Sequence, residues 1–194
     1  MKRAFTLIEL LVVIAIIAVL AAIVAPNAFR AIEKAKVTAT VADVRSIRTG
    51  AMAFYADTGQ WPASGTTTDM TPNGFLADPS TPAAPVRGWD GPYLEKWPPT
   101  AKWGGAYTFV SGVDGTGVNN VGTTLGGFNW DDTAATPNVR VVSITGVPGS
   151  AAALATTAAG KIDVEIDGAV GENAGSVRYA LANPTIVFIL VSRD

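Results

Sequence analysis

The residue with the clearest chemical potential is a single carboxylate, Glu9, which lies near the N-terminus among apolar side chains. Residues 10–25 include no polar side chain. A charged group inside a membrane span costs about 2.5–3.5 kcal/mol on insertion scales and usually has a function. Two interpretations are open: Glu9 lies near the interface and reaches the lipid headgroups, or it needs a cationic partner from another chain.

The composition excludes several kinds of chemistry. The chain has no His and no Cys, so it lacks the commonest general base, the commonest zinc ligand and every Ser-His or Cys-His arrangement. It can form no disulfide, so a folded exported part must depend on core burial, a metal ion or neighbours. No pair of carboxylates stands out for hydrolysis, and the glycine-rich residues 122–127 lack a P-loop lysine. We therefore expect no enzymatic activity.

Residues 5–25 are long and apolar enough to cross a bilayer. As a helix rising about 1.5 Å per residue they span roughly 31 Å, close to the hydrocarbon thickness. Lys2 and Arg3 precede them, and the positive-inside rule then places the N-terminus in the cytoplasm and the chain after Pro26 outside. The sequence predicts a single-pass membrane protein.

A secretory signal peptide and a plain signal anchor are alternative interpretations of this segment. The apolar run exceeds the usual core of a signal peptide, and Pro26 directly follows Ala25, the most plausible small residue for a cut. A signal anchor fits the length but leaves Glu9 unexplained. We favour an interpretation that gives Glu9 a role.

The letters AFTLIELLVVIAII at residues 4–17 resemble the class III signal of type IV prepilins and type II secretion pseudopilins. The resemblance implies that a prepilin peptidase removes the leader, residues 1–4, by cutting between Ala4 and Phe5, and that the same enzyme N-methylates Phe5. It also implies that Glu9 pairs with the N-terminal amine of an adjacent subunit. Ala4 stands where the family usually has Gly, which is a departure from the motif.

The physical chemistry of the bilayer supports such a pairing. An ammonium and a carboxylate are each costly in lipid, and they offset one another only when two subunits are in register. We therefore expect the pair between the Phe5 amine and Glu9 to set subunit register, while packing of helix residues 7–24 supplies the attraction.

A second helical pattern follows Pro26. Six apolar residues recur at three- and four-residue steps between charged ones, which predicts an amphipathic helix over residues 26–58 that ends near Gly59. One helix then runs from about residue 5 to 57, and Pro26 kinks it. Pilins that this chain resembles carry a proline at the matching place, where the helix can melt in the filament; the alternative is that Pro26 ends the span. The predicted buried stripe is Val37, Val41, Val44, Ile47, Ala51 and Phe54.

Residues 59–194 are expected to form a globular domain outside the membrane. Residues 60–105 contain too many aromatic side chains for a disordered linker, so we expect a long ordered loop. Its letters DGPYLEKWPPTAKWGGAY, residues 90–107, resemble the loop of major pseudopilins. In those proteins a Gly-Pro-Tyr-Leu stretch leads into a Trp-Gly-x-x-Tyr turn and then the first strand.

Strand signals fill residues 106–194, at 106–110, 139–145, 161–167, 176–182 and 185–191. Residues 161–167 alternate strictly between charged and aliphatic side chains, and residues 185–191 are the continuous apolar run of a central strand. Together they predict an antiparallel sheet of four or five strands, with the helix stripe packed on its apolar face. This is an α+β fold with a long N-terminal transmembrane helix, as in pilins. Residues 151–159 fit either a surface loop or a short helix.

Signals for a metal site are weak. Residues 111–120 combine oxygen ligands with glycines, and the resembling major pseudopilins bind calcium in a loop after this point, which makes Asp114 a candidate calcium ligand. The EF-hand pattern is absent, and a plain glycine-rich turn is favoured. Calcium is the one cofactor left open. The other carboxylates considered fit a helix cap or a solvated strand face better than a metal site: Asp131, Asp132, Asp163, Glu165 and Asp167.

A nucleic-acid partner is not expected. The formal net charge of −2 leaves no basic footprint for the chain as a whole. A DNA-binding minor pilin would need a basic stripe, whereas the available residues are scattered: Arg140, Lys161, Arg178 and Arg193.

These features predict a structural subunit of a type IV pilus-like filament. It would wait in the inner membrane, lose its leader, and be added by an assembly ATPase and an inner-membrane platform to a helical polymer of itself and other pilins. The loop at residues 90–107 favours a type II secretion pseudopilin in the periplasm. The long divergent part after residue 110 favours a cell-surface pilus for adhesion, motility or DNA uptake. A membrane-anchored exported enzyme or binding domain is the alternative from another class.

Overall fold

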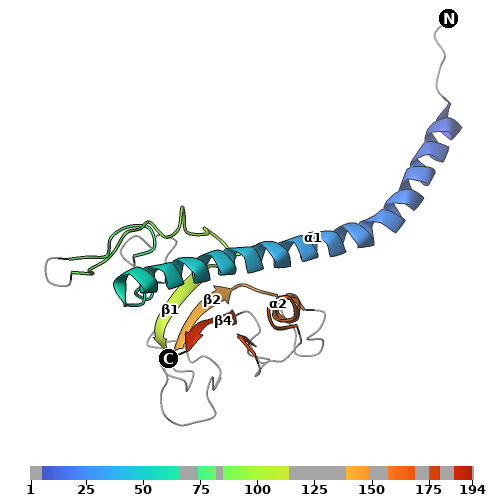
Figure 1. Ribbon diagram of the computed structural model, residues 1–194. Helices are drawn as coiled ribbons and strands as arrows, with labels where there is room; N and C mark the ends of the chain where they lie inside the picture. The colour runs from blue at the N-terminus through green and yellow to red at the C-terminus, as the bar shows by residue number, and fades with distance from the viewer. Residues whose placement is uncertain are drawn as a thin grey trace, which may run out of the picture. The chain divides into compact units, whose positions relative to one another are not determined.

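The computed structural model describes residues 6–65, 74–81, 85–113, 139–148, 157–168, 175–179 and 186–193. The chain divides into two compact units, Met1–Lys36 and Val37–Asp194, and helix α1 contributes to both. The elements, shown in Figure 1, are in chain order α1 (Leu7–Thr58), β1 (Tyr107–Val113), β2 (Val139–Thr145), α2 (Ala158–Asp167), β3 (Val177–Tyr179) and β4 (Ile186–Arg193).

Helix α1 continues through Pro26. Proline has no N–H, so the carbonyl four residues earlier, that of Ala22, loses its helical partner, yet the helix extends to Thr58. The prediction of one long helix is thus confirmed, and Pro26 lies inside it. Gly59 ends the helix as predicted: its φ of 70° lies in the left-handed region, and its N–H donates to the Tyr55 carbonyl at 2.8 Å.

The four described strands form one antiparallel sheet in the order β1-β2-β4-β3. Strand β2 has the predicted bounds, and β4 lies inside the sheet between β2 and β3, as its continuous apolar run predicted. Strand β3 lies within the predicted residues 176–182, while β1 extends three residues beyond the predicted 110.

The second unit has one core between α1 and the sheet. All six residues of the predicted stripe are buried. Paired residues of neighbouring strands, such as Phe109 with Val142 and Val142 with Ile189, point to the same face because strand partners share a side. The sheet residues in the same cluster are Tyr107, Phe109, Val142, Ile144, Val177, Val187, Ile189 and Val191. The helix-on-sheet α+β arrangement is therefore confirmed.

The strand predicted at residues 161–167 is wrong, because these residues form most of helix α2. Thr157 caps its start by accepting the Gly160 N–H at 3.1 Å, and Gly168, at φ 80°, ends it. The helix turns Ile162 into the core and leaves Val164 46% exposed, although a strand would put both on one face. Ala158, Ala159 and Ile162 join the common core. The helical spacing of these apolar residues therefore decides the structure, and the alternation of charged and aliphatic side chains does not.

The described residues of the loop before β1 pack around Phe75. Phe75 is buried and lies at its centre: its carbonyl accepts the N–H groups of Tyr93 and Leu94 at 2.8 and 3.2 Å. Its ring packs on Trp97 and Phe109, with centroids 5.5 and 5.3 Å away. The loop therefore belongs to the same core as the sheet.

Candidate assembly site on the N-terminal helix

Glu9 takes part in a capping box at the start of α1. Thr6 is the last residue before the helix, and its N–H and hydroxyl both donate to Glu9 Oε2, at 2.8 and 2.6 Å. In return, the Glu9 N–H donates to Thr6 Oγ1 at 3.4 Å. Such a reciprocal pair satisfies donors that a helix N-terminus otherwise leaves without partners. The carboxylate is thus held in place by its own chain.

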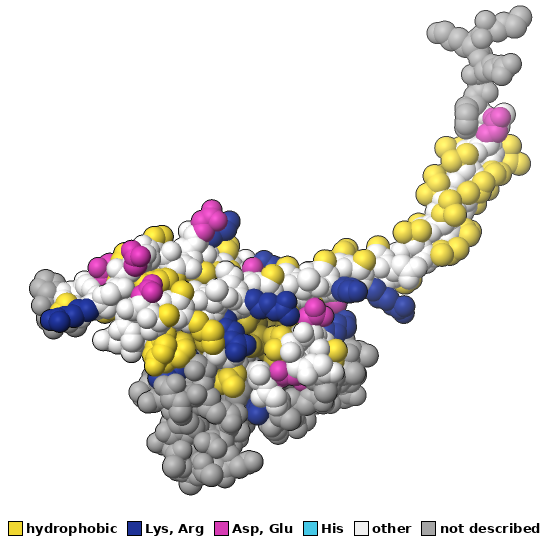
Figure 2. Space-filling model, in the orientation of Figure 1, with side chains coloured by type: hydrophobic (Ala, Val, Ile, Leu, Met, Phe, Trp, Pro, Cys, Tyr) yellow, Lys and Arg dark blue, Asp and Glu magenta, His cyan; other side chains and the backbone are white. Residues whose placement is uncertain are grey.

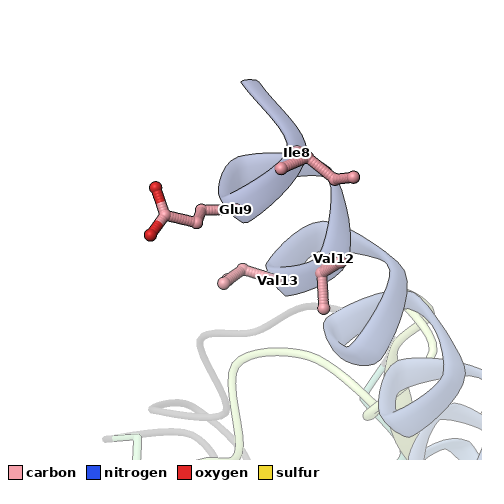
Figure 3. A pocket seen from close by; sticks show the side chains of 4 residues that line it. All are labelled: Ile8, Glu9, Val12 and Val13. Atoms are coloured by element: carbon pink, nitrogen blue, oxygen red, sulfur yellow. The ribbon is translucent and has the colours of Figure 1, made fainter. Parts of the chain in front are cut away.

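The surroundings of Glu9 are apolar. It lines a shallow hollow on the helix surface together with Ile8, Val12 and Val13, and Figure 3 shows its carboxylate projecting from the helix on the side of Val13. Glu9 and these three neighbours are all exposed. The charge of Glu9 thus lies beside exposed aliphatic side chains.

The first part of α1, residues 7–36, has nearly all of its side chains exposed. Figure 2 shows hydrophobic side chains covering it on the visible face. Among the described residues α1 is the one helix long and apolar enough to cross a membrane, and none of its most apolar window is buried. The exposed large side chains are Leu7, Ile8, Leu10, Leu11, Val12, Val13, Ile14, Ile16, Ile17, Val19, Leu20, Ile23, Val24, Phe29 and Ile32.

Other predicted site residues lie elsewhere. Pro26 is in the helix and exposed, seventeen residues after Glu9 and therefore roughly 25 Å along the axis, so the two do not form one site. The predicted cleavage and methylation positions, Ala4 and Phe5, lie outside the described residues. So do the calcium candidate Asp114 and the pair Asp131 and Asp132.

The predicted carboxylate face of residues 161–167 does not exist, because these residues are helical. Asp163 is buried while Glu165 is exposed. Asp167 has a structural role: its Oδ2 accepts the N–H groups of Ser176 and Val177, at 2.6 and 2.9 Å, at the start of β3. In the described part of the chain no group of three His, Cys, Asp or Glu side chains could hold a metal ion.

The scattered basic residues do not make an exposed stripe in the described structure. Arg140 and Arg178 are both buried. The Arg140 guanidinium lies 5.1 Å from the centre of the Trp61 ring, a cation–π contact that ties β2 to the segment after α1. These two residues are thus part of the fold and are not available to a nucleic acid.

A polar contact that the sequence did not reveal joins α1 to the sheet and its loop. The Asp43 Oδ2 accepts the Tyr107 hydroxyl at 2.9 Å and lies 2.8 Å from the Lys102 Nζ. Burial, chiefly, and the neighbouring carboxylate raise the pKa of Tyr107 above its ordinary value of 10. No local signal could have found this contact, because 64 residues separate Asp43 from Tyr107.

Two family models match the chain. The one described as the prokaryotic N-terminal methylation motif matches residues 1–25, and the one described as PilW, C-terminal, matches residues 31–122. No curated protein and no solved structure matches it.

These findings, taken with the fold, are consistent with a type IV pilin-like protein, and the predicted resemblance is confirmed at that level. Proteins of this class interact with other pilins and are processed by a prepilin peptidase. The apolar helix and the methylation motif suggest membrane anchoring.

Proposed function

We propose that this protein is a structural subunit of a helical type IV pilus-like filament, assembled from the inner membrane after its leader, residues 1–4, is removed. Glu9 carries the proposal. It is an acidic side chain at the start of a helix whose apolar surface is exposed throughout its first part. A capping box can use Gln in place of Glu, so helix capping alone does not require the charge.

The capping box leaves Glu9 able to bind a further cation. Both Thr6 donors end on the same oxygen, Oε2, whereas an ionised carboxylate offers about four acceptor sites. An ammonium group from a neighbouring subunit can therefore bind without displacing Thr6. The capping box then fixes the direction of the carboxylate, and the neighbour's Phe5 amine supplies the opposite charge.

The apolar surface of α1 supplies the contact area. Before assembly, lipid covers these side chains; in a filament, the helices of other subunits would replace the lipid. Lipid tails are as apolar as Leu, so exchanging one for the other gains little from the hydrophobic effect, and close packing together with charge pairing has to select the register. Other copies, other pilins and the membrane assembly platform are the partners of this surface.

A type II secretion pseudopilus is the more specific candidate, and the loop before β1 supports it. Leu94 of the Gly-Pro-Tyr-Leu stretch is buried and packs against Gly50 of α1. The Ala101 N–H donates to the Gly105 carbonyl at 2.7 Å in the turn that leads into β1. A turn followed directly by the first strand is the order of the major pseudopilin loop, and it supports this candidate.

Replacement of Glu9 tests the proposal. In Glu9→Ala we expect normal membrane insertion and loss of incorporation into filaments, measured by imaging sheared filaments and by immunoblotting their subunits. Glu9→Gln keeps the side-chain length but removes the charge, and it should fail similarly if charge pairing sets the register. Glu95→Ala, an exposed position in the loop, is the control. Normal filaments from Glu9→Ala would refute the proposal.

The N-terminus of the mature chain distinguishes this proposal from the alternative of a membrane-anchored exported enzyme or binding domain. Intact mass spectrometry should find a chain that begins at an N-methylated Phe5. A mature chain that keeps residues 1–4 would favour the alternative. Imaging of cell-surface filaments, followed by sequencing of their subunits, separates a surface pilus from a periplasmic pseudopilus.

A further inference from the structure

The segment of α1 directly after the apolar run has an unusual combination of side chains. Phe29 is 72% exposed and Ile32 54% exposed. Arg30 and Lys34 are exposed and Lys36 half-buried. The whole segment belongs to the first unit, Met1–Lys36. It is an exposed stretch with two large apolar side chains and three basic ones.

These side chains are sorted on the helix surface. Phe29, Ile32 and Lys36 follow one another at steps of three and four residues and share one face. Arg30 and Lys34, four residues apart, share an adjacent face. Glu33 is the one acidic residue of the segment, which leaves its formal charge at +2. Figure 2 shows Lys and Arg side chains on the helix where the continuous apolar surface ends.

The position of the segment matches the polar layer of a membrane. If residues 5–25 fill the hydrocarbon core, each flanking headgroup layer extends roughly 5–7 Å further. Phe29 then lies about 6 Å beyond Ala25 along the helix axis, and Lys34 about 13 Å beyond it. Helical side chains lean toward the N-terminus of their helix, here back toward the membrane, so the long side chains of Arg30 and Lys34 reach the headgroup layer.

We propose that residues 29–36 form an interfacial anchor that binds the anionic phosphate headgroups of membrane lipids. Phe29, whose side chain leans back toward the span, lies nearest the boundary between headgroups and acyl chains, and Ile32 lies at the outer edge of the headgroup layer. Arg30 and Lys34 bind the phosphates, and their charge makes the anchor selective for acidic lipids. The anchor fixes the depth at which the subunit waits before assembly. This inference rests on the proposed membrane-inserted subunit and names a second partner for its helix.

The absence of cysteine makes a direct test possible in the full-length protein. Single substitutions Ile32→Cys, Val19→Cys and Ser46→Cys would each carry a fluorescent label, and the labelled chains would be reconstituted in phosphatidylcholine vesicles with added phosphatidylglycerol. Quenching by brominated phosphatidylcholine and by brominated phosphatidylglycerol then reports which lipid lies beside each position. Position 19 reports insertion of the span, and position 46 reports an exposed part of α1 well beyond it.

We expect brominated phosphatidylglycerol to quench the label at position 32 severalfold more than brominated phosphatidylcholine, because each basic side chain near an anionic surface contributes a factor of about five. The double variant Arg30→Gln and Lys34→Gln should bring this ratio close to one. The matched variant Arg45→Gln and Arg48→Gln removes two exposed charges further along the same helix and should leave the ratio unchanged.

Three outcomes would overturn the anchor. The label at position 32 could be as little quenched as that at position 46, it could be quenched equally by the two lipids, or its quenching could fall as protein density rises because a second copy covers it. In each case, continued quenching at position 19 would still support a membrane-inserted subunit. Loss of quenching at position 19 would instead refute the membrane anchoring on which both proposals depend.

Discussion

The two parts of helix α1, residues 7–36 and 37–58, carry the same kinds of apolar side chain but differ in how far these are buried. In the first part Ile16 is 56% exposed, while in the second part Ile47 is 0% exposed. The second part has a covering sheet in its own unit, and its stripe is buried there. The first part exposes its large side chains over its whole length. We conclude that the second part stabilises the fold, and we propose that the first part binds lipid and other chains.

The largest contrast should come from truncating the same residue type in each part. Ile47→Ala leaves a cavity in the core and should lower the free energy of unfolding by about 2–5 kcal/mol. Ile16→Ala removes an exposed side chain and should change it by less than about 0.5 kcal/mol. Urea unfolding of the full-length protein in detergent, followed by near-UV circular dichroism, measures both. If the two substitutions lowered the free energy of unfolding by similar amounts, the two parts of α1 would not have the different roles described.

Removal of the Tyr107 hydroxyl should lower the free energy of unfolding by an intermediate amount, because this hydroxyl binds the second part of α1. Tyr107→Phe removes the hydrogen bond to the Asp43 carboxylate and should cost about 1.5 kcal/mol at neutral pH. Because its pKa is raised, folded Tyr107 keeps its proton at pH values where an unfolded tyrosine loses it. Stability should therefore fall as the pH rises above about 10.

Urea midpoints on either side of pH 10 check both parts of this prediction. The Phe variant should be the less stable protein at neutral pH, and it should lose less stability than the original as the pH rises. An identical alkaline decline in the two proteins would mean that Tyr107 does not titrate as its burial implies.

The smallest effect is expected for the ion pair of the same carboxylate. Lys102 and Asp43 are both partly exposed, and such pairs contribute about 0.2–1 kcal/mol. Lys102→Ala should lower the urea midpoint slightly at low salt, and the difference should shrink at high salt because the charges are screened. A loss as large as that of Ile47→Ala would show that polar contacts hold the second part more than its apolar stripe does.

The sequence predicted α1, its stripe, β2 and the central place of β4, because each depends on a regular pattern with one interpretation. It failed at α2, where residues 161–167 satisfy both a strand and a helix pattern. The deciding signals were the residues at the two ends, Thr157 and Gly168, which cap the helix. A search for caps before a search for alternation would have predicted the helix.

The candidate site was only partly foreseeable. Glu9 stood out because a charge is rare in an apolar run. The bond from Thr6 was equally readable, since Thr three residues before Glu is the sequence of a capping box. The contact of Asp43 with Tyr107 and Lys102 was beyond prediction, since it depends on how a sheet and a loop fold onto a helix far away in the sequence.

Photo-crosslinking from position 16 tests most directly whether the first part of α1 is meant for other subunits. A photoreactive amino acid in place of Ile16 would be activated in cells that carry the assembly machinery, and the products would be identified by mass spectrometry. We predict covalent dimers and larger multimers of this protein in the filament fraction, and their loss when Glu9→Ala is added. Adducts to lipid alone, or multimers that persist in Glu9→Ala, would contradict the account.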